Sequence, residues 1–285
     1  MAKLLSAKAR DLGGFTVRRL LPQAECKMVG PFVFFDHMGP TTFPAGTGIN
    51  VRPHPHIGLA TMTYLFSGAI LHRDSLGSIQ EIFPGDVNWM TAGKGIVHSE
   101  RETIETRGQS HTLDGLQCWL ALPEDKTHIE PSFTHVPKAE LPYIHREKIL
   151  MRLVAGDAYG RSSPVKTYSA MFYLDVIAEQ GAKLERPCGS QETAVYLQMG
   201  SILIGETQYS AGDFVVLDAT DSELIVQKNA RFILLGGEKF DRQPYLYWNF
   251  LAYDKSTIEQ AKERWQQGLF ATIPGDDEEF IALTD

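Results

Sequence analysis

The chain has 285 residues, of which 43% are hydrophobic and 22% are charged, a composition typical of a globular protein that argues against disorder. No run of about 18 consecutive apolar residues occurs, and Met1–Leu5 leads into no signal-peptide core, so neither a membrane span nor a secretory leader is expected. The formal net charge is −8 and no dense basic cluster occurs, so direct binding to nucleic acid is not expected.

Three cysteines, Cys26, Cys118 and Cys188, occur at irregular spacing and form no CxxC pair. An odd number of cysteines without such a pair is typical of a reducing compartment. The sequence therefore predicts a cytoplasmic protein without structural disulfides. Its length allows two domains of ordinary size, or one large domain.

Short β-rich runs follow one another along the chain, separated by frequent glycines and prolines. Many short strands between turn residues predict an all-β sandwich or barrel. The expected strands, in chain order, are Phe15–Leu20, Phe32–Asp36, Ala60–Leu71, Ile79–Phe83, Val87–Thr91, Leu116–Leu122, Ala170–Ile177, Ala194–Met199, Ser201–Ile204, Phe214–Leu217, Leu224–Gln227 and Arg231–Leu235.

A helix is predicted only near the C-terminus. Ser256–Glu259 has the Ser-x-x-Glu pattern of a capping box, and Gly268 stands where a glycine ends a helix. Between them, apolar residues recur at helical spacing: Ile258, Ala261, Trp265 and Leu269. We expect this short helix to pack its apolar face on a barrel.

One β-unit occurs twice in the sequence. Each copy has an Arg-Pro pair, an apolar strand beginning with Tyr-Leu, and a Gly-Asp turn before the next strand: Arg52-Pro53, Tyr64–Leu71 and Gly85-Asp86 in the first copy, Arg186-Pro187, Tyr196–Leu203 and Gly212-Asp213 in the second. Two copies of one β-unit predict two similar barrels.

The repeat and the prolines divide the chain into four predicted parts. We expect an N-terminal barrel over residues 1–125 and a proline-rich connection between barrels over residues 126–147. A C-terminal barrel over residues 148–240 follows, and the helix with its tail packs on the barrels over residues 241–285.

Four candidate metal ligands stand in two pairs within the first copy of the repeat. His54 and His56 are separated by one residue, and so are His98 and Glu100. Residues i and i+2 of a strand point to the same face, so each pair projects together. Three imidazoles and one carboxylate suit a divalent transition metal: Fe(II), Mn, Co, Ni, Cu or Zn.

The second copy lacks these ligands. When the Arg-Pro pairs are aligned, Cys188 and Ser190 stand at the places of the histidine pair, and Leu224–Gln227 holds no second pair. We therefore expect metal in the N-terminal barrel only. The other histidines are expected to be structural or solvent-facing: His37, His72, His111, His128, His135 and His145.

The spacing G-x5-H-x-H from Gly48 to His56 resembles the first motif of the cupin superfamily. Cupins usually carry a glutamate soon after the two histidines as a further ligand. Here Ala60 and Thr61 stand in that region, and Glu100 supplies the carboxylate. With this rearrangement the chain closely resembles the pirin family over the runs His54–Gly58, Gly85–Glu100 and Leu116–Pro123.

The resemblance implies a bicupin fold, in which two jelly-roll barrels follow in tandem. It implies iron in the N-terminal barrel, held by the residues that match the pirin ligands: His54, His56, His98 and Glu100. Pirins often carry Arg-Gly-Phe-Glu after the second histidine, so Ala60 replaces a usual family glutamate. Some bacterial pirins are quercetin 2,3-dioxygenases, and eukaryotic pirins act as nuclear transcriptional cofactors.

Three functional hypotheses follow. In the first, the protein opens the ring of a metal-bound flavonol, or a similar flat aromatic, with O2, and Glu100 accepts the substrate proton as general base. Four aromatic and apolar residues are either ordinary barrel core or, if the strand runs unbroken from His56, the lining of that pocket: Met62, Tyr64, Phe66 and Trp89. The alternative is a metal- and redox-sensing regulator that acts through a protein partner. The third is a cupin that binds or detoxifies another small molecule.

Overall fold

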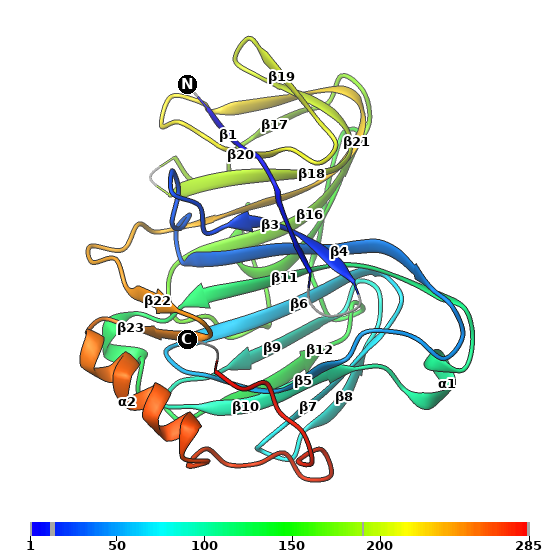
Figure 1. The fold of residues 1–285 in the computed structure, drawn as a ribbon. Coiled ribbons are helices and arrows are strands. Elements are labelled where there is room, and N and C mark those ends of the chain that lie inside the picture. The colour runs from blue at the N-terminus through cyan, green and yellow to red at the C-terminus, as the bar shows by residue number, and fades with distance from the viewer. Residues whose placement is uncertain (1, 12–14, 190, 284–285) are drawn as a thin grey trace. The chain divides into compact units, whose positions relative to one another are not determined.

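The computed structural model describes residues 2–11, 15–189 and 191–283, so Ser190 lies outside the described residues. The described chain is almost entirely β-structure (Figure 1), which confirms the expected all-β fold with a short C-terminal helix. The helical elements are α1 (Ile104–Arg107), η1 (Glu124–Lys126) and α2 (Lys255–Gln266). The strands are β1 (Lys3–Leu5), β2 (Lys8–Asp11), β3 (Thr16–Leu21), β4 (Phe32–Phe43), β5 (Val51–His56), β6 (Leu59–Ser67), β7 (Ile70–Asp74), β8 (Ile79–Ile82), β9 (Val87–Thr91), β10 (Ile96–Arg101), β11 (His111–Ala121), β12 (Ser132–Val136), β13 (Tyr143–Arg146), β14 (Ile149–Ala158), β15 (Arg161–Ser162), β16 (Met171–Ala178), β17 (Lys183–Glu185), β18 (Glu192–Ile204), β19 (Thr207–Ser210), β20 (Phe214–Val216), β21 (Glu223–Gly237), β22 (Tyr245–Tyr247) and β23 (Phe250–Ala252).

The chain forms two compact units, and each combines segments that are distant in the sequence. The first unit comprises Ala9–Arg18, Phe34–Lys138 and Asp241–Asp285, and the second comprises Met1–Lys8, Arg19–Val33 and Ala139–Phe240. The N-terminal strand belongs to the second unit because β1 pairs antiparallel with β20, with Lys3 opposite Val216. This long-range pairing places the start of the chain outside the unit that the sequence analysis assigned to it.

The first unit is built from two sheets. A seven-stranded sheet has the order β12-β9-β6-β11-β4-β3-β2, and a four-stranded sheet has the order β5-β10-β7-β8. One apolar core joins them, because Leu65 of β6 and Leu113 of β11 cluster with Ile70 of β7 and Ile82 of β8. The helix α2 lies beside β23 (Figure 1).

The second unit holds a ten-stranded sheet whose main path is β1-β20-β18-β21-β16-β14-β13. Its core is an apolar cluster drawn from these strands. The predicted repeat is visible in the turns, since Gly85 has φ 87° and Gly212 has φ 94°. Each following aspartate, Asp86 or Asp213, accepts the backbone N–H three residues before it. Glycine tolerates this left-handed conformation, and an aspartate acceptor is typical of such a turn.

The region 126–147 contains two strands where an irregular connection was expected. β12 pairs with β9 at the edge of the seven-stranded sheet, and β13 pairs with β14 at the edge of the ten-stranded sheet. Pro131 and Pro137 flank β12 on either side. Proline cannot donate to a ladder but is tolerated beside edge strands, so these prolines delimit a strand.

The helix α2 begins earlier than its sequence pattern indicates. Its N-cap is Asp254, whose Oδ1 accepts the backbone N–H of Thr257 at 2.8 Å. The Asp254 carboxylate also accepts the hydroxyls of Ser256 and Thr257, so it replaces Ser256 as the capping group. At the other end Gly268 has φ 67°, as expected of a glycine that follows a helix C-cap.

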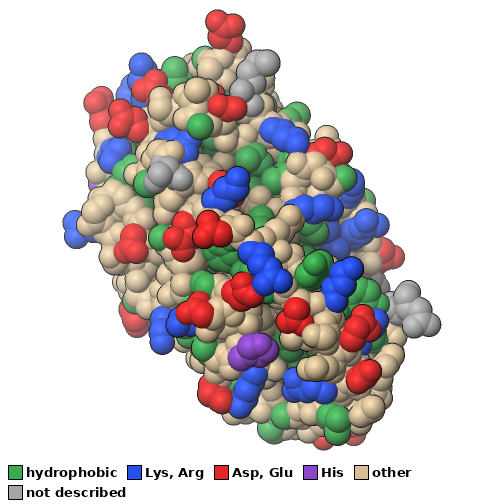
Figure 2. Space-filling view, turned by 90° about the vertical axis from the view of Figure 1, so that its left-hand side faces the viewer, with side chains coloured by type: hydrophobic (Ala, Val, Ile, Leu, Met, Phe, Trp, Pro, Cys, Tyr) green, Lys and Arg blue, Asp and Glu red, His purple; other side chains and the backbone are tan. Residues whose placement is uncertain are grey.

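The surface carries charges of both signs. On the face drawn in Figure 2, Lys and Arg side chains are interspersed with Asp and Glu. None of Cys26, Cys118 and Cys188 forms a disulfide, as expected. None of the helices in the described residues is both long enough and apolar enough to span a membrane.

Candidate metal centre

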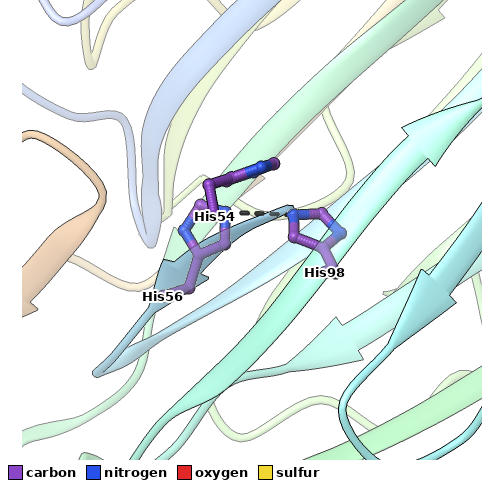
Figure 3. Close-up of side chains that lie close together, drawn as sticks. All are labelled: His54, His56 and His98. Atoms are coloured by element: carbon purple, nitrogen blue, oxygen red, sulfur yellow. Dashed lines mark hydrogen bonds between the residues drawn. The ribbon is translucent and has the colours of Figure 1, made fainter. Parts of the chain in front are cut away.

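Three of the four predicted ligands meet where β5 and β10 pair. In the antiparallel register His98 stands opposite His54, and Ile96 stands opposite His56. Alternation along each strand therefore sends the three imidazoles to one face of the four-stranded sheet (Figure 3). The ring of Trp119, from β11 of the seven-stranded sheet, meets the His56 ring edge-on at 5.0 Å between centroids. The histidines thus point into the first unit.

The three rings are close together and removed from water. Each ring offers one nitrogen as a ligand atom, and these three nitrogens all lie within 4.8 Å of one another. Nε2 of His56 lies 3.1 Å from Nε2 of His98. Exposure is 6% for His54, 0% for His56 and 1% for His98. Burial of this degree strongly disfavours a protonated imidazole.

Backbone carbonyls fix the protonation of two of these rings. Nδ1 of His54 donates to the carbonyl of Arg52 at 2.9 Å, and Nδ1 of His56 donates to the carbonyl of Asn249 at 3.2 Å. A neutral imidazole carries one N–H, so Nε2 of each ring presents a lone pair. A hydrogen bond from the second ring nitrogen is the usual support of a metal-binding histidine.

A second histidine and an aspartate fix the third ring. Asp74 Oδ2 accepts Nε2–H of His72 at 2.9 Å, which leaves Nδ1 of His72 as an acceptor. That atom lies 3.5 Å from Nδ1 of His98, a long contact in which a neutral His72 accepts and His98 donates. Nε2 of His98 therefore also carries a lone pair.

His72 and Asp74 were not among the sequence-predicted site residues. They have the same i, i+2 spacing as the two ligand pairs, and this signal could have found them. They act through the pairing of β7 with β10, which sets His98 opposite Asp74. His72 is buried, and its ring stacks on Phe133 with 4.2 Å between centroids.

The electrostatics keep all three imidazoles neutral. Burial lowers the pKa of His54 from 6.5 to about 4, and the Arg52 carbonyl opposes this only in part. Burial, followed by the neighbouring histidines, lowers the pKa of His56 and of His98 well below 6.5. At neutral pH each ring thus has a lone pair free to bind an ion, and protons compete weakly for it.

The arrangement fits a transition metal. Two Nε2 lone pairs that face each other at 3.1 Å repel unless a cation lies between them. Nitrogens at adjacent positions around one metal would be about 3 Å apart at metal–nitrogen distances near 2.1 Å. Buried neutral imidazoles whose second nitrogens are hydrogen-bonded are what such an ion requires.

Glu100 lies close to this group but outside the set whose ligand atoms share the 4.8 Å limit. The β10–β5 register shifts between His98 and Glu100, so Glu100 pairs with Val51. Oε1 of Glu100 lies 3.3 Å from the Thr63 hydroxyl. Burial raises the pKa of Glu100 above its usual range, and the neighbouring His72, followed by hydrogen bonds to Thr63 and Gln117, opposes that rise. Its role as fourth ligand stays a prediction.

The residues of β6 that face the site differ from those expected. The Thr63 hydroxyl reaches Glu100 at 3.3 Å and Gln117 at 2.7 Å, so the odd-numbered positions of β6 face the histidines. The candidate lining residues of β6 stand at even-numbered positions and therefore point to the opposite face: Met62, Tyr64 and Phe66. Trp89 of β9 pairs with Met62 and so points to the same side. The strand does not continue from His56, since Gly58 adopts φ 70° between β5 and β6.

Polar side chains and one aromatic ring of the seven-stranded sheet therefore face the histidines. Thr63 and Gln117 stand opposite each other in the β6–β11 register, and Trp119 stands opposite Thr61. Trp119 stacks on Phe34 with 3.9 Å between centroids and an interplanar angle of 11°. An indole held in this way is a rigid surface beside His56.

Comparison with known families agrees with the repeat. Residues 14–120 match the family model of pirin, and residues 173–271 match that of the pirin C-terminal cupin domain. Together the two matches span more than half of the chain. They place one cupin domain in each half of the sequence.

Individual proteins resemble the chain over most of its length. A pirin-like protein of Caulobacter vibrioides is 42% identical over 99% of this chain and 99% of its own. Pirin of Rattus norvegicus is 32% identical over 85% of this chain and 82% of its own. The crystal structure of a quercetin 2,3-dioxygenase from Acinetobacter baumannii covers 100% of this chain and 95% of its own, with 33% identity and a TM-score of 0.91.

Proposed function

The chain belongs to the pirin family, and we propose that it is a metal-dependent dioxygenase that opens the heterocycle of quercetin or a similar flavonol with O2 and loss of CO. The observation that carries this proposal is the cluster of three buried, neutral histidines with Nε2 lone pairs in one barrel. The similarity to a quercetin 2,3-dioxygenase of known structure supports the choice of reaction.

His54, His56 and His98 would hold the metal, with Glu100 as fourth ligand. The family favours Fe(II), and the donor set also suits Mn, Co, Ni, Cu and Zn. Once bound, a divalent metal supplies Lewis acidity that lowers the pKa of a flavonol hydroxyl. Arg52, Asn249 and the His72–Asp74 pair hold the imidazoles in the tautomer that this role needs.

Glu100 would take the proton of the substrate hydroxyl. Its carboxyl group is held near the histidines by the contact with Thr63, and its raised pKa makes it a stronger base than an exposed glutamate. Gln117 accepts from the Thr63 hydroxyl at 2.7 Å, which orients that hydroxyl. Glu100, Thr63 and Gln117 would thus position the hydroxyl oxygen of the substrate beside the metal.

Trp119 would orient the flavonol. Its ring is fixed by the stack on Phe34 and lies against His56, so a flat aromatic ligand bound at the metal has an aromatic surface within reach. The buried surroundings of the histidines would also limit water at the reacting atoms.

The test combines metal analysis with oxygen uptake. The protein is stripped with a chelator, reconstituted with each candidate metal, and assayed in an oxygen electrode with quercetin. We expect one metal per chain and uptake with at least one metal. His54→Ala should lose metal, Glu100→Gln should bind metal less tightly and consume little oxygen, and the exposed His128→Ala should match the wild type.

Two outcomes would contradict the proposal. Full metal stoichiometry in His54→Ala would refute the ligand assignment. Tight metal binding by the wild type without oxygen uptake on any metal form would refute the enzymatic hypothesis and favour the regulatory alternative, in which the loaded protein contacts a protein partner.

A further inference from the structure

A separate cavity lies behind the strands that carry the histidines. It has a volume of about 210 Å³ and is bordered by Pro53 of β5 and Val97 of β10. These residues are the neighbours of His54 and His98, so they face the other side of the four-stranded sheet. The C-terminal segment forms the remaining wall: Trp265, Gly268, Phe270, Ala271, Thr272, Ile273, Asp276, Asp277, Glu279 and Phe280.

Three aromatic rings stand at right angles around this cavity. The Trp265 and Phe280 rings have centroids 5.6 Å apart and an interplanar angle of 87°. The Trp265 and Phe270 rings have centroids 5.9 Å apart and an angle of 78°. The indole thus forms one wall and the two phenyl rings meet it nearly perpendicularly. Aromatic walls of this kind present electron-rich faces to a cation. The guanidinium of Arg264 already lies over the Phe270 ring, 4.4 Å from its centroid, so the Trp265 and Phe280 rings are the walls left for a ligand.

The charged residues of the cavity all have one sign. Asp276, Asp277 and Glu279 border it, and no Lys, Arg or His is among the described residues that line it. Arg101 pairs with Asp276 at 2.8 Å and with Glu279 at 3.1 Å. Asp277 is exposed and has no ion pair within 4.0 Å among the described residues. At least one carboxylate charge is therefore left for a ligand.

The cavity is held in shape by hydrogen bonds to the C-terminal segment, which is red in Figure 1. The Trp265 indole Nε1–H donates to the carbonyl of Ile281 at 3.0 Å, and the Ile281 N–H donates to the carbonyl of Pro53 at 2.9 Å. Asp276 Oδ2 accepts from the Ser99 hydroxyl at 2.6 Å. The segment is thus tied to β5, to β10 and to α2.

From the perpendicular rings, the carboxylates and the absence of lining cations, we propose that this cavity binds a quaternary ammonium group such as that of choline. An anion would meet the carboxylates, and a neutral apolar ligand would leave them unused. A volume of about 210 Å³ is below the roughly 300–1,000 Å³ of pockets for drug-sized ligands, so it suits a headgroup. Methylated ammonium ions are the ligands that aromatic cages select.

The test uses choline and its neutral isostere 3,3-dimethyl-1-butanol. The full-length protein is titrated with each at constant ionic strength, by calorimetry and by NMR of the ¹⁵N-labelled tryptophan indoles. We expect saturable choline binding with a Kd of about 1 mM or below, a shift of the Trp265 indole resonance, and at least tenfold weaker binding of the isostere.

Three variants separate the aromatic and charge contributions. Trp265→Leu should weaken choline binding about tenfold or more, and Trp265→Phe should recover part of it. Asp277→Asn changes only an exposed side chain, so its fold is retained, and it should weaken choline about threefold without affecting the isostere. Glu278→Gln, the exposed neighbour that does not line the cavity, is the matched control.

Equal affinity for choline and the isostere would show that the cavity is only apolar and would overturn the proposal. So would the lack of saturable choline binding by the wild-type protein. An Asp277→Asn variant that binds choline as the wild type does, together with a Trp265→Leu variant that is folded and unaffected, would also overturn it.

Discussion

The substitution Asp74→Asn tests how the protein fixes the metal-binding tautomer of His98. Asp74 is fully buried, and its Oδ2 accepts Nε2–H of His72 at 2.9 Å. Its Oδ1 accepts the backbone N–H groups of Leu76 and Ser78 at 2.9 and 3.0 Å, and an asparagine oxygen can keep these two bonds. The asparagine NH2 group then replaces Oδ2 and faces His72 as a donor.

The substitution changes which nitrogen of His72 carries the proton, and then which nitrogen of His98 does. His72 must become an acceptor at Nε2, so its proton moves to Nδ1, which lies 3.5 Å from Nδ1 of His98. His98 then avoids a clash of two N–H groups by carrying its own proton on Nε2. That proton occupies the nitrogen that faces His56 at 3.1 Å. The substitution thus blocks one metal-binding atom without removing a ligand.

Loss of such a supporting partner typically costs about 10- to 100-fold in metal affinity, or about 1.4–2.8 kcal/mol. We expect this loss for Asp74→Asn, measured by competition with a chromophoric chelator. Long-range ¹H–¹⁵N NMR of the histidine rings should show His98 protonated at Nε2 in the metal-free variant.

The control is Asp86→Asn, which alters another buried carboxylate of the first unit. Asp86 accepts the backbone N–H of Lys138 and does not touch the histidine cluster. Its metal affinity should be that of the wild type. Unchanged affinity in Asp74→Asn, or reduced affinity with His98 still protonated at Nδ1, would refute the tautomer argument.

Two further predictions concern stability. The pKa of His54 is about 4 in the folded chain, against 6.5 for a histidine exposed to water, so the unfolded state binds more protons between these values and stability falls as the pH drops through this window. For the metal-free protein we expect this group to reduce the free energy of unfolding by about 2 kcal/mol at pH 5 relative to pH 7, measured by urea unfolding. The same dependence of the free energy of unfolding on pH in His54→Ala would contradict this prediction. Gly58→Ala should be strongly destabilising, because φ is +70° and a Cβ would lie 2.0 Å from the carbonyl oxygen of Leu251. The control Gly205→Ala, where φ is +57° and the space around the Cβ is open, should cost only about 1–2 kcal/mol in thermal or urea unfolding. Similar losses of stability in both variants would show that the contact with Leu251 is unimportant.

Local patterns accounted for much of the fold and for the core of the site. Short strands between glycine and proline turns predicted the all-β architecture, and the i, i+2 spacing placed His54 and His56 on one face of one strand. The repeat predicted two related units, whose Gly85 and Gly212 turns match. These inferences succeed because strand alternation and turn chemistry depend on residues that are adjacent in the chain.

The tertiary structure decided the rest. The alternation of His54 and His56 did not carry into β6, because the positive φ of Gly58 breaks the strand, and so Thr63 faces the site where Met62 was expected. The start of the chain joined the second unit through the pairing of β1 with β20.

The sequence by itself therefore predicted a set of candidate metal ligands, of which the structure brings His54, His56 and His98 together, and two similar β-units. Only the tertiary structure decided that His72 and Asp74 support His98, and which side chains share the cavity. The spacing of a ligand pair is a property of one strand, and sequence shows it directly. The support of a ligand depends on which strand becomes its neighbour, here β7 beside β10, and strand pairing is set by packing of the whole unit.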